Sequence, residues 1–212
     1  MLVGERMSRP VISVTPDDPI NDVLAMFKKE HIRRAPVLKG RKLVGIISER
    51  DLLNASPSKA TSLSIWELHY LISKVQVTSV MSRNVLTVGT DTPIEEAARI
   101  MAESKIGGLP VVDAGQVVGM ITETDLFKVF LELLGAREQG IRATVALQDK
   151  PGQLANVTRA IADRGGLIVA IAALPAATGT TQVMVKSTGL SKDDVVATLT
   201  PVVISIQDIR EV

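Results

Sequence analysis

Hydrophobic and polar residues follow the same pattern twice along the first part of the chain. Positions 7–53 and 81–127 align without a gap at a spacing of 74 residues, and 17 of the 47 aligned positions are identical. In each copy a short apolar stretch precedes a segment with one apolar helical face, such as Ile20, Val23, Leu24 and Phe27. Two short strands and a final helix follow. The pattern therefore predicts two copies of a βαββα unit that bury a face against each other.

The pattern changes after Gly135. Alternating apolar positions between 141 and 147 predict a strand, and a Pro-Gly turn then opens a helix with one apolar face. Two strands, a helix capped by Ser191 and a last strand complete the order βαββαβ, which is the ferredoxin-like arrangement. The sequence thus predicts an α/β (α+β) protein with a first repeat at 1–60, a connector helix at 61–79, a second repeat at 80–134 and a separate domain at 139–212.

Composition and charge exclude several classes of function. The chain has 212 residues, a formal net charge of +1 and only 2% aromatic residues, which argues against a nucleic-acid partner. Without cysteine it has no disulfide, thiolate zinc site or cysteine nucleophile, and its two histidines are 38 residues apart, so we expect no metal site. The longest apolar run, 167–174, is too short to span a bilayer, and the chain starts without a signal-like segment. We therefore expect a cytoplasmic protein with no membrane partner.

The most informative short motif places a hydroxyl and a carboxylate three residues apart at the start of each final helix. The pairs are Ser48 with Asp51 and Thr122 with Asp125. A hydroxyl at a helix start suits a phosphate, and an aspartate can accept hydrogen bonds from both hydroxyls of a ribose. The same residues also suit simple helix capping. The sequence leaves both interpretations open.

The two repeats differ most in charge. Arg33 and Arg34 of the first repeat align with Gly107 and Gly108 of the second. Guanidinium–phosphate hydrogen bonds are strong, so we hypothesise that the cleft of the first repeat holds a phosphorylated ligand more tightly. The alternative is a basic surface that is merely solvated.

Both repeats resemble CBS (cystathionine β-synthase-type) domains, paired as in a Bateman module. The resemblance rests on Met-Ser-Arg before the first strand, Pro-Ile at the helix start, the Pro-Val strand and Gly-x-x-Ser/Thr-x-x-Asp. It implies that adenosine-containing ligands bind in clefts between the repeats, one with Ser48 and Asp51 beside 32–35, the other with Thr122 and Asp125 beside 106–109. The nucleotide-binding residues that it implies are Thr15, Ile32, Arg33, Arg34, Ala35, Ser48, Arg50, Asp51, Ile106, Gly107, Gly108, Leu109, Thr122, Thr124 and Asp125.

The last 74 residues resemble an ACT domain. The resemblance rests on the motif Asp149-Lys-Pro-Gly-Gln-Leu154 within the order βαββαβ, and it implies a dimerisation module with a site for a small amino acid. Backbone amides at a helix start suit the carboxylate of such a ligand. The alternative is ordinary turn chemistry. The implied amino-acid-binding residues are Asp149, Gly152, Gln153 and Leu154.

Together these features predict a regulatory ligand sensor without catalysis. No nucleophile elbow, phosphate-binding glycine loop or dinucleotide fingerprint is present, so we expect no catalytic residues and no catalytic cofactor. The expected ligand is AMP, ADP or ATP, with NAD and S-adenosylmethionine as further candidates, and the expected assembly is a homodimer. The domain order resembles the bacterial acetoin-utilisation (AcuB) group. The alternatives are a scaffold that binds partners without a small molecule, a regulatory subunit of a metabolic enzyme complex, and an enzyme.

Overall fold

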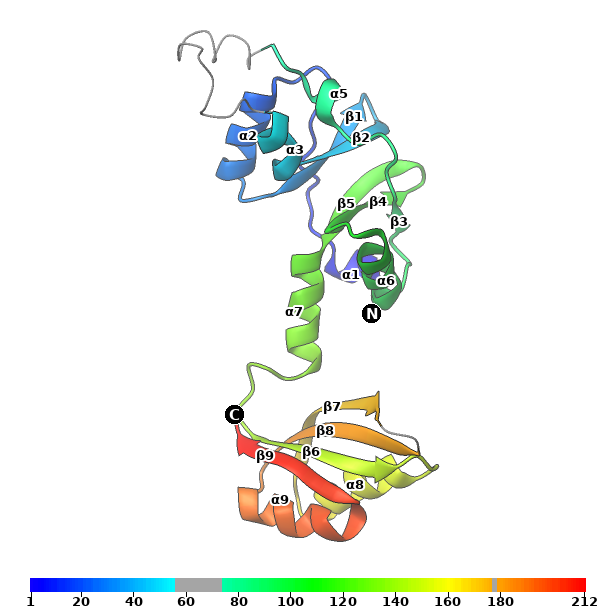
Figure 1. Cartoon of the computed structure of the whole chain (residues 1–212), viewed down its shortest axis with the longest axis vertical. Coiled ribbons are helices and arrows are strands. Elements are labelled where there is room, and N and C mark those ends of the chain that lie inside the picture. The colour runs from blue at the N-terminus through cyan, green and yellow to red at the C-terminus, as the bar shows by residue number, and fades with distance from the viewer. Residues whose placement is uncertain (56–73, 177–178) are drawn as a thin grey trace. The chain divides into compact units, whose positions relative to one another are not determined.

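The computed structural model describes residues 1–55, 74–176 and 179–212 (Figure 1). The chain divides into two compact units, Met1–Leu126 and Phe127–Val212. Most of the connector helix expected at 61–79 lies outside the described residues. Its described end contains the short helix α5 (Val77–Val80).

The first unit contains the two repeats as mixed α and β structure. The first repeat has α2 (Ile20–Lys29), β1 (Arg34–Lys39), β2 (Lys42–Ser48) and α3 (Glu49–Ala55). The second has β3 (Val88–Gly89), α6 (Ile94–Ser104), β4 (Gly108–Asp113), β5 (Gln116–Thr122) and α7 (Glu123–Leu133), which continues into the second unit. In the first repeat the expected opening strand is a single bridge from Val14 to Val37, whereas β3 pairs parallel with β4 in the second.

The helices α2 and α6 bury most of the face that the sequence predicts, although Leu24 of α2 is only half-buried. Ile20, Val23 and Phe27 of α2 are buried, as are Ile94 and Met101 of α6, with Ala97 between them. The antiparallel pairs β1–β2 and β4–β5 each carry an irregularity at the same place in the hairpin, after Val37 and after its counterpart in β4. The duplication is therefore preserved down to the strand register.

The segment before each repeat pairs with the other repeat. Met7 lies beside Gly119 of β5, and Met81 lies beside Gly45 of β2. A Cβ atom at either glycine would collide with the methionine sulfur, which explains why both repeats have glycine there. Bridges from Ser8 to Met120 and from Ser82 to Ile46 continue the exchange, as does a short helix, α1 (Val3–Arg6), hydrogen-bonded to the loop after β3. Neither repeat therefore completes its core alone.

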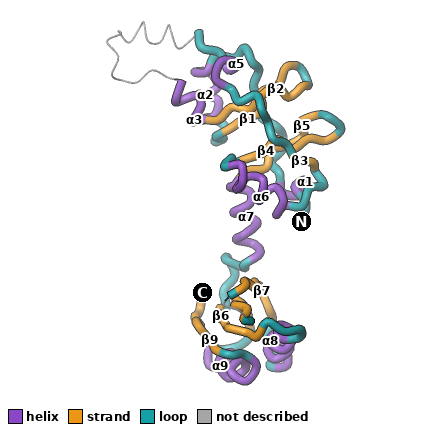
Figure 2. The backbone as a smooth tube through the Cα atoms, turned by 45° about the vertical axis from the view of Figure 1, so that its right-hand side comes forward, coloured by secondary structure: helices purple, strands orange, loops and turns teal. Residues whose placement is uncertain are grey.

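The second unit has helices on one face of a four-stranded antiparallel sheet (Figures 1 and 2). Its elements are β6 (Ile141–Gln148), α8 (Gln153–Asp163), β7 (Leu167–Pro175), β8 (Thr180–Thr188), α9 (Lys192–Leu199), a 3₁₀ turn (Thr200–Val202) and β9 (Ser205–Glu211). The strand order is β7-β8-β6-β9. Odd-numbered residues of β6 pack with α8 and α9 around Val157, Ile161, Val195 and Leu199. The other face of the sheet carries the even-numbered residues of β6 and β8.

Candidate functional site

A cavity of about 740 Å³ lies in the first unit, where the two repeats meet. Its walls come from the end of β2 and the start of α3, from the segment after Met81, and from the end of α6 through the start of β4. The lining residues are Arg33, Arg34, Ile46, Ile47, Ser48, Glu49, Arg50, Asp51, Ser82, Asn84, Val85, Leu86, Ser104, Lys105, Ile106, Gly107 and Gly108. A volume of this size lies within the range of ~300–1,000 Å³ that is typical of small-molecule sites.

Ser48 and Asp51 form a helix cap at the edge of this cavity. The Ser48 hydroxyl and backbone amide donate to Asp51 Oδ2 at 2.6 and 2.8 Å. Thr122 and Asp125 repeat the arrangement at 2.7 and 3.0 Å. The capping geometry is thus present in both repeats, and in the first repeat it leaves Asp51 Oδ1 unused by the cap.

Two arginines of the first repeat reach the second. Arg33 Nη2 donates to Thr124 Oγ1 at 3.3 Å. The side chain of Arg34 lies against Gly107 and Gly108, and a Cβ atom at either glycine would collide with it. Burial lowers the pKa of the Arg34 guanidinium, and the nearby carboxylate of Glu123 opposes this shift. Arginines in one repeat and glycines in the other are therefore complementary, because the glycines leave the space that Arg34 occupies.

The cavity combines residues that the sequence analysis assigned to two different clefts. Ser48 and Asp51 share a cavity with 106–108 of the opposite repeat as well as with both arginines, because the segment before each repeat crosses over. The expected residues that line this cavity are Arg33, Arg34, Ser48, Arg50, Asp51, Ile106, Gly107 and Gly108. Those that do not line it are Thr15, Ile32, Ala35, Leu109, Thr122, Thr124 and Asp125.

Local packing explains several of these omissions. Ala35 and Leu109 are fully buried, and Ile32 packs against the core of the first repeat. The Thr15 hydroxyl and amide both donate to the carboxylate of Asp18 at 2.7 Å. Asp125 is also buried.

Several cavity residues were missed by the sequence analysis. Ser82 and Asn84 belong to the segment that crosses to the first repeat, where Ser82 exchanges two backbone hydrogen bonds of 2.9 Å with Ile46. Lys105 ends α6 in the left-handed conformation, with φ of 55°. The repeated Met-Ser-Arg motif was the available signal for the crossing segment. Its position beside the opposite repeat could not be read from the motif itself.

The expected amino-acid-binding residues lie around the turn that opens α8. Gly152 has φ of 86°, and no atom lies within 4 Å of where its Cβ would be. The Asp149 amide donates to the carbonyl of Gly179 at 2.9 Å, whereas Gln153 is half-buried and Leu154 is exposed. The left-handed glycine accounts for the Pro-Gly turn chemistry.

In residues 1–55, 74–176 and 179–212 no helix combines the length and the apolar character needed to cross a membrane. The same described residues contain no group of three or more histidine, aspartate or glutamate side chains placed to hold a metal ion.

Curated relatives match the first unit. The chain is 31% identical over 136 residues to a CBS domain-containing protein of Dictyostelium discoideum, covering 63% of this chain and 94% of the relative. It is 33% identical over 120 residues to inosine-5'-monophosphate dehydrogenase of Korarchaeum cryptofilum, covering 56% of this chain. In that enzyme the match spans only 22% of the length.

Two solved structures share the fold of the same region. A putative acetoin utilization protein (AcuB) of Vibrio cholerae matches with a TM-score of 0.54 and 30% identity, over 65% of this chain and 95% of that one. CBSX2, a protein of Arabidopsis thaliana solved in complex with AMP, matches with a TM-score of 0.52 and 32% identity, over 62% of this chain and 97% of that one. The family described as "CBS domain" matches residues 3–58 and 77–132, and these two ranges are the two repeats. The chain belongs to the CBS domain family, with two CBS domains in tandem.

Proposed function

We propose that this chain is a regulatory protein without catalysis that binds an adenine nucleotide in the 740 Å³ cavity between its CBS domains. The observation that carries the proposal is the composition of the cavity wall. Two carboxylates, Asp51 and Glu49, lie in it with four cationic side chains, those of Arg33, Arg34, Arg50 and Lys105. A carboxylate for ribose hydroxyls and cations for phosphate are what a nucleotide requires.

In this proposal five cavity residues have a defined task. Asp51, whose Oδ2 holds the cap, accepts hydrogen bonds from the ribose through Oδ1. The guanidiniums of Arg33 and Arg34 hold phosphate, and the apolar wall of Ile46 and Val85 contacts the base. The structure of CBSX2 with AMP supports this class of ligand. NAD and S-adenosylmethionine remain candidates because they share the adenosine group.

Binding in this cavity would couple the two CBS domains. Its walls come from both domains, so a ligand that fits one relative pose better than another shifts the equilibrium between poses. This is the physical basis of the regulatory role. The Dictyostelium relative, of which this chain covers 94%, is named only for its CBS domains, and this supports a role in which the CBS pair itself is the functional module.

For the second unit, the proposal is an ACT domain that dimerises the chain and senses an amino acid. Its element order βαββαβ and the strand order β7-β8-β6-β9 support a ferredoxin-like fold. The amino-acid site proposed here is the turn with Asp149, Gly152, Gln153 and Leu154. A cytoplasmic homodimer of the acetoin-utilisation type completes the proposal, and sedimentation at micromolar concentration tests the dimer.

Thermal unfolding and calorimetric titration with AMP, ADP, ATP, NAD and S-adenosylmethionine test the nucleotide site. A ligand at a hundred times its dissociation constant adds about 2.7 kcal/mol to the free energy of unfolding. Asp51→Asn should weaken binding about tenfold, by loss of a charge-assisted hydrogen bond. Asp125→Asn is the matched control, because it alters the equivalent cap outside the cavity.

Two results would contradict the proposal. If none of the five compounds changes the unfolding temperature, the chain is better described as a scaffold. If Asp51→Asn and Asp125→Asn weaken binding equally, the helix caps, and not the cavity carboxylate, control the affinity.

A further inference from the structure

A second cavity, of about 340 Å³, lies on the face of the C-terminal sheet opposite α8 and α9. All four strands contribute to it, and no residue proposed above for nucleotide or amino-acid binding lines it. The lining residues are Arg142, Thr144, Ala172, Leu174, Gln182, Met184, Gln207, Asp208 and Arg210. The cavity has a charged end at β6 and β9 and an apolar end at β7 and β8.

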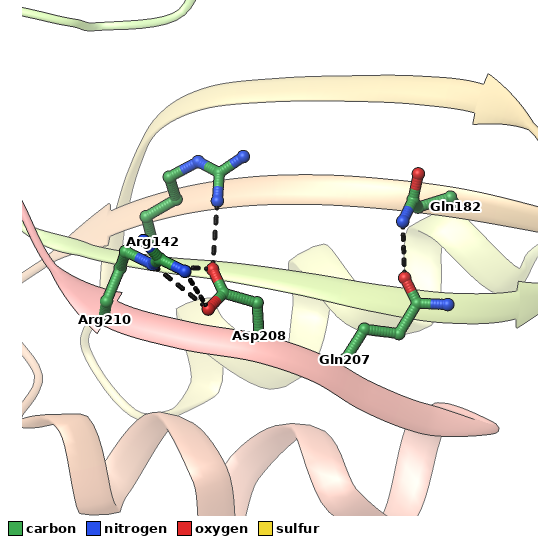
Figure 3. Close-up of polar contacts among 5 residues, drawn as sticks. All are labelled: Arg142, Gln182, Gln207, Asp208 and Arg210. Atoms are coloured by element: carbon green, nitrogen blue, oxygen red, sulfur yellow. Dashed lines mark hydrogen bonds and ion pairs between the residues drawn. The ribbon is translucent and has the colours of Figure 1, made fainter.

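The charged end is an ordered cluster of two arginines around one aspartate (Figure 3). Arg142 Nη1 donates to Asp208 Oδ2 at 3.1 Å. Arg210 donates through Nε to both carboxylate oxygens, at 3.1 and 2.9 Å, and through Nη2 to Oδ1 at 2.6 Å. The hydrogen bonds from Arg210 lower the pKa of Asp208, so this carboxylate is ionised at neutral pH and orients both guanidiniums.

The charge of this cluster favours an anion. Two guanidiniums and one carboxylate leave a net charge of +1, which one monoanion neutralises. A guanidinium carries five N–H donors. Arg142 uses only one of its nitrogens to donate to Asp208, and Arg210 uses two. Both arginines therefore keep donors for a second carboxylate. Lys186, the next cation on this face, donates instead to the backbone carbonyls of Gly135 and Glu138.

The same cluster disfavours a positively charged group on the ligand. Asp208 already accepts four hydrogen bonds from the two arginines, so it offers little to an ammonium. The Gln182 amide of β8 donates to the side-chain oxygen of Gln207 of β9 (Figure 3). A zwitterion would bury its ammonium beside two guanidiniums without a paired carboxylate.

The apolar end of the cavity favours a hydrocarbon chain on the ligand. Ala172, Leu174 and Met184 form it, and Leu174 is 62% exposed in this structure. A hydrocarbon chain placed over these side chains would remove apolar surface from water. A volume of 340 Å³ is near the lower limit of the range of ~300–1,000 Å³ for ligand sites, which favours a short chain.

We propose that this cavity binds a short aliphatic monocarboxylate. Its carboxylate bonds to Arg142 and Arg210, and its hydrocarbon chain covers Met184, Leu174 and Ala172. The site is independent of the nucleotide cavity, so the second unit would sense a small organic acid directly.

Methionine-methyl NMR of the full chain tests the proposal. Met184 is the only methionine among residues 127–212, so its ¹³C-labelled methyl group reports on this cavity alone. Titration with 4-methylpentanoate should shift the Met184 signal to saturation, with a dissociation constant on the order of millimolar because the arginines are partly exposed. The signals of Met7, Met81 and Met120, which lie in the first unit, should not move.

Matched compounds and variants test separately the ammonium group of the ligand, its negative charge and the two arginines. L-Leucine, which differs by its ammonium, and 4-methylpentanamide, which lacks the charge, should each bind at least about tenfold more weakly. Arg142→Gln and Arg210→Gln should each weaken binding of 4-methylpentanoate about tenfold. Arg159→Gln, an exposed arginine on α8, is the control and should leave binding unchanged.

Three results would overturn the proposal. The first is a Met184 signal that does not shift to saturation. The second is equal affinity for 4-methylpentanoate and L-leucine, or an affinity of the Arg142→Gln variant for 4-methylpentanoate that equals that of the unmodified chain. The third is a Met184 signal that changes on dilution of the protein, which would mean that a second copy of the chain covers this face.

Discussion

The replacement Gly107→Ala tests whether the complementary arginine and glycine form the nucleotide cavity. An added Cβ would collide with Arg34 Nη2 and would lie 2.7 Å from Glu123 Oε2, which is closer than real Cβ contacts. These atoms are at the ends of flexible side chains, so the side chains should move and the backbone should not. We expect the free energy of unfolding to fall by no more than about 1 kcal/mol, which is near the centre of the distribution for point mutants.

Nucleotide affinity should respond much more strongly than stability. Displacing Arg34 removes one charge-assisted hydrogen bond to phosphate, worth about 1.5–3 kcal/mol, and we expect the lower end because Arg33, Arg50 and Lys105 also line the cavity. Affinity for AMP should therefore fall about tenfold, as it should for Arg34→Ala. In the Arg34→Ala background, Gly107→Ala should have little further effect, because the guanidinium that it would displace is already absent and only Glu123 Oε2 remains close to the added Cβ.

Calorimetric titration of the two single variants and the double variant measures the coupling, with urea unfolding as the check on folding. The expected coupling energy is about 1.5 kcal/mol, well above the additivity error of ~0.3–0.5 kcal/mol. Additive losses would refute the reasoning. So would unchanged affinity in Gly107→Ala, because Arg34 would then not bind the ligand from its position beside the glycine.

Three further predictions concern the second unit. Gly140→Ala should lower the free energy of unfolding by about 1–3 kcal/mol in urea, because its Cβ would lie 2.6 Å from the rigid backbone oxygen of Ser187. Lys186→Met should cost about 1–3 kcal/mol in the same assay, because two backbone carbonyls of the segment before β6 lose a buried donor; an unchanged midpoint would contradict this. The pKa of Asp208 is lowered mainly by its hydrogen bonds from Arg210, so its contribution to stability is complete above the ordinary aspartate pKa of ~3.9 and is lost as pH falls toward the lowered value. Asp208→Asn should remove that part of the acid dependence of unfolding, and an identical pH profile would show that the ion pair does not stabilise the fold.

The periodicity of the sequence predicted most of the elements that the structure describes, with the exception of the opening strand of the first repeat, which is a single bridge at Val14. Apolar residues at helical spacing place Ile20, Val23 and Phe27 on one face of α2. That face is buried because it is the apolar stripe of the helix, and its burial removes apolar surface from water. Alternation in β6 likewise predicts which of its residues face the helices. These features depend on local geometry, which the order of residues alone determines.

The composition of the nucleotide cavity depended on contacts between distant segments. The sequence by itself determined two similar repeats, each with a capping hydroxyl and carboxylate, and an arginine pair aligned with a glycine pair. It suggested two clefts, one basic and one not. Only the tertiary structure decided that Ser82 and Asn84 cross to the first repeat, and that Arg34 fills the space beside Gly107. The physical reason is that the exchange of segments depends on packing between residues far apart in the sequence, and local sequence patterns do not predict such contacts.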